Sequence, residues 1–324
     1  MTCEPETVAR PRKWRRISLR AALILLTCLA LWMGWHANRV HQQRKGIAAI
    51  LALRGYPGLS YENPQSPVRP VDAVWFFPGQ MDKPPAPQWL MDVVGSDFFT
   101  RVVFVSLRGS RATDGDLACL RGLPEIRTLI LEESRIGDDG LAHVGSLRRL
   151  EHLNIRNSLV AGDGLRHLNR LPALKGIELK GPRVTDATLT CLAELSDLTN
   201  VFIEESAVKK DGWTALGQLE NLHTLCLLKN DIDDDGLEPI AKLSNLKMLS
   251  IYECPLSDAA LLHISQLPKL KSLVISDAKV TDRGLVHLRR LQNLRTLELR
   301  RTKVTATGIA ALKRDLPNLN VDKN

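Results

Sequence analysis

The chain has 324 residues, of which 44% are hydrophobic and 25% charged, and it carries a formal net charge of +8. This length and apolar content suit a packed fold and exclude a disordered chain. Residues 1–54 hold ten Lys/Arg and two Asp/Glu, which accounts for the whole excess, so the charges of residues 55–324 balance. A balanced fold has no overall attraction to phosphate backbones, and we therefore expect no nucleic acid partner.

The N-terminus combines a basic tail, residues 1–16, with an apolar stretch. Residues 21–35 are uncharged and mostly apolar, which predicts a transmembrane signal anchor over residues 17–37. No A-x-A cleavage site follows, and a helix is expected to continue beyond residue 38, although a cleaved signal peptide remains an alternative. Six Lys/Arg precede the apolar core and three follow it within ten residues. The positive-inside rule predicts a single-pass protein of the cell (inner) membrane, with a cytoplasmic N-terminus and the remainder outside.

A linker and a cap are expected between the anchor and residue 102. Residues 38–88 begin as a helix and become a proline-rich spacer, because residues 55–88 hold eight of the 17 prolines. The sequence WLMDVVGSDFFTRVV, which begins at Trp89, has the periodicity of a short helix. We expect residues 89–101 to form an N-terminal cap over the open edge of the first repeat.

Residues 102–314 hold nine consecutive units with a period of 24 residues, and the last unit is cut short by the C-terminal cap. Each unit is apolar at its first, fourth and sixth places, as in Leu222, Leu225 and Leu227. This alternation predicts a short strand with one face inward, and apolar residues at places 16, 19 and 22 predict a helix. The final LKRDLPNLNV departs from the count by one residue, and residues 315–324 are expected to cap the array.

The acidic run DIDDDG at residues 231–236 matches the start of a calcium loop, but it is one instance of the repeat. A calcium loop needs a Glu at its twelfth place, where this chain has Lys242, so no calcium site is expected. Six units carry Asp at place 13, where the chain turns into the helix: Asp114, Asp138, Asp186, Asp234, Asp258 and Asp282. We expect these carboxylates to accept free amide hydrogens of that turn and to meet the positive end of the helix dipole. Gly at place 15 suits a tight turn.

The stretches LRTLELRRTKVTATGIAAL and LKSLVISDAKVTDRGLVHL resemble the leucine-rich repeat signature L-x-x-L-x-L-x-x-[NCT]-x-[LVI]. The resemblance implies an α/β leucine-rich repeat solenoid, a horseshoe with a parallel concave sheet, which here follows a transmembrane helix. The unit is similar to the subtype of ribonuclease inhibitors and F-box adaptors, and the whole chain resembles bacterial membrane-anchored leucine-rich repeat proteins. An anchor and a proline-rich stretch stand where an adaptor has its F-box, so an adaptor function is not implied.

No motif of a common enzyme class is present, since the chain lacks G-x-S-x-G, H-E-x-x-H, C-x-x-C and a P-loop. We therefore predict a protein that is not an enzyme and has no cofactor. Four histidines share place 18, but no Asp or Cys completes a zinc site beside them, and we interpret them as half-exposed helix residues: His143, His167, His263 and His287. The cysteines of the repeats lie roughly 13 Å or more apart in this geometry, too far for a disulfide.

Places 3, 5, 7 and 8 are predicted to point from the concave sheet into solvent. Most are charged or small, but one apolar group has a charged rim. The apolar residues are Phe202, Cys226, Leu228, Met248 and Tyr252, and the rim consists of Glu204, Glu205, Lys229 and Glu253. Such a composition is typical of a binding hot spot and predicts a protein partner, of unknown identity, for a monomeric membrane-tethered module. Two alternatives remain: a structural or self-associating element of the cell envelope, and apolar residues scattered by repeat drift.

Overall fold

The computed structural model describes residues 19–54, 56–59 and 101–323. The predicted basic tail, the proline-rich spacer after residue 59 and residues 89–100 of the predicted cap lie outside these residues. The helices, with η for 3₁₀ helices, are α1 (Leu19–Ala52), η2 (Asp114–Gly122), α3 (Asp138–Val144), η3 (Asp163–Arg170), α4 (Asp186–Ala193), α5 (Lys210–Leu216), η4 (Asp235–Leu237), η5 (Ile240–Lys242), α6 (Asp258–Ile264), α7 (Asp282–Leu288) and α8 (Ala306–Asp315). The strands are β1 (Tyr56–Leu59), β2 (Val102–Ser106), β3 (Thr128–Ile130), β4 (His152–Asn154), β5 (Gly176–Lys180), β6 (Asn200–Glu204), β7 (Thr224–Leu228), β8 (Met248–Tyr252), β9 (Ser272–Ser276), β10 (Thr296–Arg300) and β11 (Asn320–Asp322).

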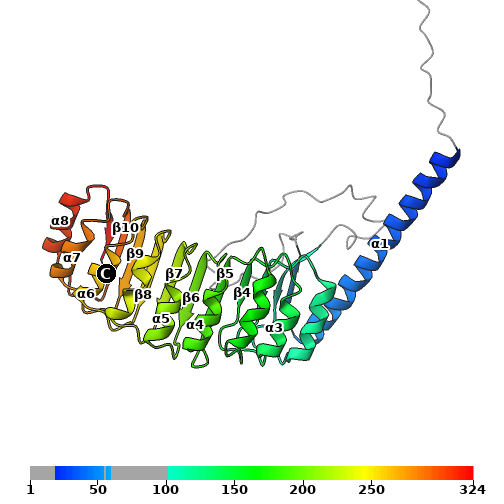
Figure 1. Cartoon of the computed structure of the whole chain (residues 1–324), viewed down its shortest axis with the longest axis horizontal. Coiled ribbons are helices and arrows are strands. Elements are labelled where there is room, and N and C mark those ends of the chain that lie inside the picture. The colour runs from blue at the N-terminus through cyan, green and yellow to red at the C-terminus, as the bar shows by residue number, and fades with distance from the viewer. Residues whose placement is uncertain (1–18, 55, 60–100, 324) are drawn as a thin grey trace, which may run out of the picture.

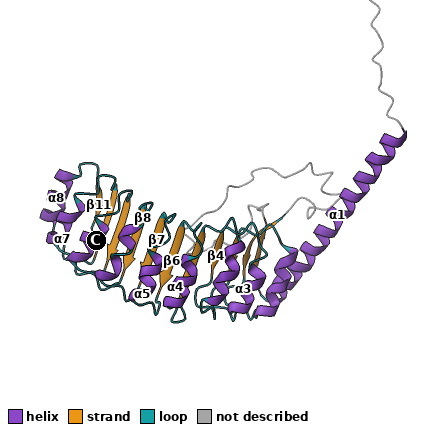
Figure 2. Ribbon diagram, viewed as in Figure 1, coloured by secondary structure: helices purple, strands orange, loops and turns teal. Residues whose placement is uncertain are grey.

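One sheet runs through the whole array, with its strands in chain order. Strands β2 to β11 are parallel, and each pairs with the next in a 24-residue register, as Leu225 does with Leu249. Figures 1 and 2 show the strands on the inner side of a curved solenoid and the helices on its outer side. The predicted α/β solenoid with a parallel concave sheet is confirmed. The array also gains a tenth parallel strand, β11, which keeps the register although the apolar pattern slips there.

The core lies between the sheet and the helices. Leu222, Leu225 and Leu227, at places 1, 4 and 6 of the sixth unit, are fully buried, and the same places are buried in every unit. Leu285 and Leu288 close the core from the helical side in the eighth unit. Full burial of one such side chain stabilises the fold by about 2 kcal/mol, so the repeated apolar places are the main source of stability.

The helical half of the unit varies more than the strand. Units one, three and six have 3₁₀ helices instead of α-helices. In the sixth unit Pro239 separates η4 from η5, because proline has no amide hydrogen and cannot continue a helix of hydrogen bonds. The period of the apolar residues predicts a helix in each of these units but does not distinguish the two helix types.

Residues before the repeats cover the first unit. The C-terminal half of α1 packs against η2, where Ile50 is fully buried and Ile47 and Leu53 are partly buried. Strand β1 pairs antiparallel with β2 and covers the backbone of the sheet edge. This cover comes from residues 43–59, whereas the predicted cap at residues 89–101 stays a prediction.

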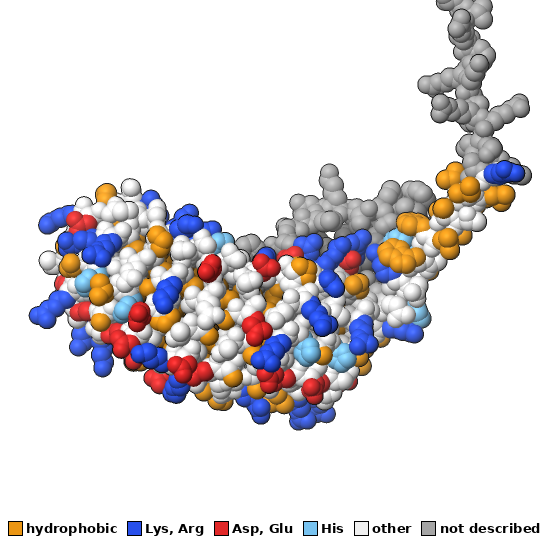
Figure 3. Space-filling model, in the orientation of Figure 1, with side chains coloured by type: hydrophobic (Ala, Val, Ile, Leu, Met, Phe, Trp, Pro, Cys, Tyr) orange, Lys and Arg blue, Asp and Glu red, His pale blue; other side chains and the backbone are white. Residues whose placement is uncertain are grey.

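The N-terminal half of α1 projects from the solenoid (Figure 1). Its apolar side chains are exposed, among them Leu26 at 62% and Leu31 at 75%, and they form the apolar surface seen on this helix in Figure 3. Within the described residues, Leu23–Ala52 is a helix long and apolar enough to cross a membrane or to act as a signal sequence. The helix extends beyond the predicted anchor at residues 17–37 and continues without a break into the cover of the first unit.

The aspartates of place 13 join neighbouring units. The expected hydrogen bonds to the amides of their own turn are therefore replaced by hydrogen bonds to the next unit. Asp258 accepts hydrogen bonds from the Thr281 amide and hydroxyl, both at 2.7 Å, and Thr281 begins the helix of the next unit. The other five make the same bond to the next unit: Asp114, Asp138, Asp186, Asp234 and Asp282. Five of the six aspartates lie in the first turn of a helix, as predicted. Their carboxylates, however, accept hydrogen bonds from the start of the helix in the next unit and not from the start of the helix that carries them.

Candidate functional site

The parallel register brings the predicted apolar residues together on strands β6, β7 and β8. Phe202 lies beside Cys226, and Leu228 lies beside Tyr252. Met248 is paired with Thr224 at the beginning of β8. Because side chains alternate along a strand, all five lie on the face opposite to the core. We call them the concave patch.

The residues of the concave patch differ in exposure. Met248 is 36% exposed, and the other four side chains are half-buried. Burial raises the pKa of the Cys226 thiol to about 12, and it also raises the pKa of Tyr252. Both groups therefore stay neutral near pH 7. The concave patch is an uncharged surface in the middle of a charged sheet face.

The predicted rim needs one correction. Glu204 is only 5% exposed and forms ion pairs with Arg156 and with Lys180, the latter at 2.6 Å. Glu204 is thus a buried centre of an ion network and not part of an exposed rim. Glu205 and Lys229 do lie at the surface and pair at 3.5 Å.

The rest of the rim occupies place 8, where the strand ends. Glu205, Lys229 and Glu253 all have a positive φ, at 48°, 54° and 51°. This left-handed conformation turns the chain away from the sheet, and it is uncommon for residues other than glycine and asparagine. The three charged side chains therefore stand at one end of the concave patch, next to Leu228 and Tyr252.

Sequence reasoning missed a contact at the other end of the concave patch. The guanidinium of Arg156 lies 5.1 Å from the centre of the Phe202 ring, a cation–π geometry. Arg156 also lies 3.9 Å from Glu178, and Lys180 pairs with Glu205 at 3.2 Å. Arg156 lies in the turn after β4 and Phe202 lies on β6, at a different place of the unit, so neither the repeat nor local spacing signals this contact.

The network shifts the protonation of its members. Burial raises the pKa of Glu178, in spite of the opposing charge of Arg156. The hydrogen bond from Lys180 lowers the pKa of Glu205, and the hydrogen bond to Glu204 raises the pKa of Lys180. The ion pairs therefore favour the charged forms of Glu205 and Lys180, whereas Glu178 is destabilised by its surroundings.

The acidic run at residues 231–236, which resembles the start of a calcium loop, has structural roles. Asp233 accepts the Gly236 amide at 2.9 Å, Asp231 pairs with Lys209 at 3.1 Å, and Asp234 holds Ser257 of the next unit. Across the described part of the chain, no three His, Cys, Asp or Glu side chains converge as metal ligands. The histidines of place 18 lie on the outer helices, and Cys119, Cys191, Cys226 and Cys254 are free thiols.

The family model of the leucine-rich repeat region matches residues 120–319. The chain belongs to the leucine-rich repeat family. Leucine-rich repeat structures similar to it include internalin C2 of Listeria monocytogenes, at 22% identity and a TM-score of 0.40, covering 69% of this chain and 81% of that one. An internalin (inlF) of the same organism has 15% identity and a TM-score of 0.36, with coverages of 72% and 92%. No curated protein gives a significant match.

Proposed function

We propose that this leucine-rich repeat protein is a membrane-tethered interaction module that binds a protein partner on the concave patch. The observation that carries the proposal is the neutral, partly exposed group of Phe202, Cys226, Leu228, Met248 and Tyr252 on a face where most other places are charged or small. Aromatic and aliphatic side chains surrounded by charge are the usual centre of a binding site. The absence of common enzyme motifs agrees with a binding role without catalysis.

The ion network supports the binding role by positioning one anchor. Arg156 is held by Glu178 and Glu204 and covers one face of Phe202, so the ring has little freedom before a partner arrives. An ordered aromatic anchor loses less conformational entropy on binding than a mobile one. The rim residues Glu205, Lys229 and Glu253 supply polar contacts around the anchors.

The same proposal includes the tether. The exposed apolar half of α1 supports an uncleaved signal anchor, and the six basic residues before it support a cytoplasmic N-terminus with the solenoid outside the inner membrane. The helix on the outer side of most units supports the ribonuclease-inhibitor-like subtype of the repeat. Protease added to intact spheroplasts is expected to digest the repeats, and full protection would reject this orientation.

The binding role is tested by substitution at the two aromatic anchors. A pull-down from envelope extracts with the full-length protein is expected to recover a defined partner in stoichiometric yield. Phe202→Ala and Tyr252→Ala are each expected to weaken its binding by about 2 kcal/mol, close to thirtyfold in Kd. Leu262→Ala is the matched control, because Leu262 is 41% exposed but lies on the outer helix α6.

Two results would contradict this function. Recovery of the chain itself, with no other protein, would favour a self-associating or structural element of the envelope. Loss of partner binding in Leu262→Ala, with unchanged binding in both aromatic variants, would move the site to the outer helices.

A further inference from the structure

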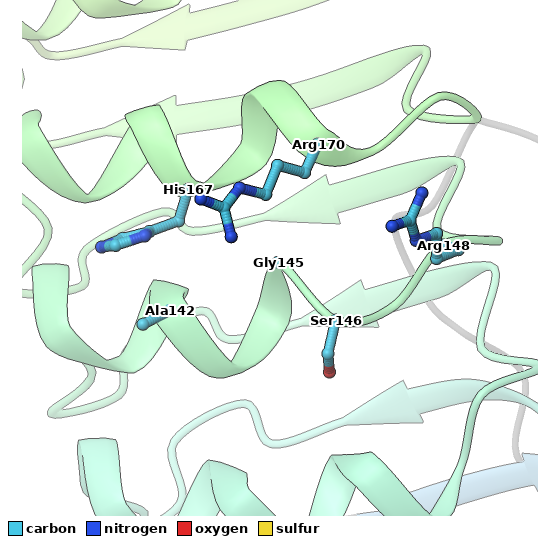
Figure 4. Close-up of a pocket in the computed structure, with 6 residues that line it drawn as sticks. All are labelled: Ala142, Gly145, Ser146, Arg148, His167 and Arg170. Carbon is cyan, nitrogen blue, oxygen red and sulfur yellow. The ribbon is translucent and has the colours of Figure 1, made fainter.

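A cavity of about 360 Å³ lies on the outer side of the solenoid, between α3 and η3. Its lining residues come from the C-terminal ends of both helices: Ala142, Gly145, Ser146, Arg148, His167 and Arg170. Figure 4 shows His167 and Arg170 extending from η3 over the gap and Arg148 standing on the loop after α3, while Ser146 points away. The lining carries three basic side chains and no carboxylate.

The positive charge of this cavity is not compensated. Two nearby arginines are paired, Arg149 with Glu125 at 2.5 Å and Arg127 with Glu151 at 3.2 Å. Arg148 and Arg170 form no ion pair with any residue that the structure describes. The C-terminal ends of α3 and η3 each contribute a partial charge of at most about −0.5, and together they do not cancel two guanidinium groups. The cavity is therefore suited to an anion.

The cavity also lies on the edge of the solenoid from which α1 departs. A Cβ on Gly122, at the end of η2, would be 2.8 Å from the Gln42 carbonyl oxygen, so α1 passes directly over this end. The charge of Arg39 on α1 acts on Arg101 and Glu125, and Glu125 in turn bonds Arg149, the neighbour of Arg148. Arg39, Arg101 and Arg149 thus lie around Glu125, between the departing helix and Arg148 of the cavity.

The direction of α1 determines what this edge faces. The apolar stretch of α1, residues 21–35, precedes Gln42, and it extends beyond the C-terminal end of η2, which Gln42 contacts. Helices α3 and η3 are stacked in turn on η2. If α1 crosses a membrane, the C-terminal ends of these helices point toward its surface. This step rests on the proposed tether.

We propose that the cavity of Arg148, His167 and Arg170 binds the phosphate headgroup of an anionic phospholipid. A guanidinium group matches two phosphate oxygens, and it binds a phosphodiester more specifically than an ammonium group does. The site holds the first units of the solenoid close to the membrane, and it leaves the concave patch on the opposite side of the sheet open for a partner. Each arginine contributes roughly fivefold to lipid affinity.

The test uses the full-length chain in lipid nanodiscs. One set contains phosphatidylcholine alone, and the other contains phosphatidylcholine and phosphatidylglycerol in equal parts. Hydrogen exchange of residues 138–149 and 163–171 is expected to be slower in the anionic discs, while exchange of α6 and α7 is the same in both. The double variant Arg148→Gln/Arg170→Gln is expected to lose the difference.

The matched control removes the same charge elsewhere. Arg283→Gln/Arg290→Gln is expected to keep the lipid-dependent protection, because Arg290 has the place of Arg170 in the eighth unit, far from α1. Equal exchange in the two kinds of disc would overturn the lipid site, as would the same protection from soluble glycerol phosphate added to phosphatidylcholine discs. Failure of the chain to insert into either disc would reject the tether, and the lipid site with it.

Discussion

Asp258 illustrates how one side chain joins two units. Its carboxylate bonds Thr281 of the next unit, and a Cβ built on Gly284 would lie only 2.6 Å from its Oδ1. Glycine at place 15 therefore leaves room for the aspartate of the preceding unit. After Gly162, which stands at an aspartate place, place 15 of the next unit is Thr188, whose hydroxyl donates to the Ala161 carbonyl oxygen at 2.6 Å. The pairing is not strict, since Lys210 is followed by Gly236 and Asp234 by Ala260.

This pairing predicts a coupled effect on stability. Asp258→Ala is expected to cost about 2 kcal/mol, because two hydrogen bonds to a charged acceptor are lost. Gly284→Ala is expected to cost about 1–3 kcal/mol in the native chain through overpacking. In the Asp258→Ala background the glycine substitution should cost about 1 kcal/mol less, since its nearest neighbour is gone.

Urea unfolding of the four chains of this double-mutant cycle measures the coupling. Asp139→Ala and Gly115→Ala are the controls: Asp139 is exposed, and a Cβ on Gly115 meets nothing within 4 Å. Strictly additive effects of the two substitutions would show that the aspartate and the glycine do not share this space.

The sequence alone reveals the repeated aspartate and glycine, but it does not show that the aspartate bonds the next unit. Asp at place 13 and Gly at place 15 are visible in the repeat, and a local turn is the nearest explanation for both. The actual contact spans 23 residues, from Asp258 to Thr281. Both residue types are lost together at Gly162 and Thr188, but Lys210 with Gly236 and Asp234 with Ala260 break this correlation, so the sequence carries no consistent signal of the contact.

At the scale of strands, the register predicts neighbours better than it predicts burial. Phe202 and Cys226 are 24 residues apart and pair as expected. Glu204 stands at a place that faces solvent, but it is buried because Arg156, from the turn after β4, and Lys180, from the neighbouring strand β5, converge on it. Because neighbouring strands are about 4.8 Å apart, long side chains of several units can meet. The residue pattern of a single unit does not predict such contacts between units.

The ion network predicts that Glu178→Gln and Glu205→Gln change the thermal stability at pH 7 in opposite directions. Burial raises the folded-state pKa of Glu178, so the folded state binds more protons than the unfolded one and stability falls as pH rises through this range. Glu178→Gln is therefore expected to raise Tm at pH 7, with a gain that disappears as the pH falls to the unfolded pKa. The variant keeps an acceptor for Asn154, which bonds Glu178 at 3.0 Å.

Glu205→Gln is the matched comparison. The hydrogen bond from Lys180 lowers the folded-state pKa of Glu205, so its stabilisation is present above the unfolded pKa and is lost as pH falls through the folded value. Glu205→Gln is thus expected to lower Tm at pH 7 and to match the native chain in acid. Thermal unfolding between pH 3 and about 8 measures both, and changes of the same sign at pH 7 would contradict the assignment.

At the scale of the whole molecule, helix α1 has two roles. The sequence pattern predicts instead an anchor at residues 17–37 and a linker after it. The first half of α1 is exposed and apolar, and its second half is part of the core, with Gly46 against Leu123 and Ile50 fully buried. Sequence reasoning assigned the cover of the first unit to residues 89–101, because they directly precede it. The cover from residues 43–59 was not predicted, since its contacts cross more than 40 residues that carry no repeat.

The two roles can be separated by truncation. A chain that begins at residue 39 keeps the cover and is expected to unfold at nearly the same urea concentration as the full chain in detergent. A chain that begins at residue 55 loses Ile47, Ile50 and Leu53 from the core. It is expected to be less stable by roughly 3–5 kcal/mol, which is the burial of one complete and two partial aliphatic side chains.

The shorter chain also exposes the first unit to other molecules. Leu117, Leu120 and Leu123, which are buried at present, would face water, and a solenoid without its terminal cover associates through that surface. Light scattering is therefore expected to show association of the chain that begins at residue 55 and a monomer for the one that begins at residue 39. Ile50→Asp in the longer chain isolates the effect of the cover and should reproduce most of the lost stability, since it places an unpaired charge in the core. Equal urea midpoints for the two truncated chains would mean that the helical part of the cover contributes nothing and that α1 is an anchor alone.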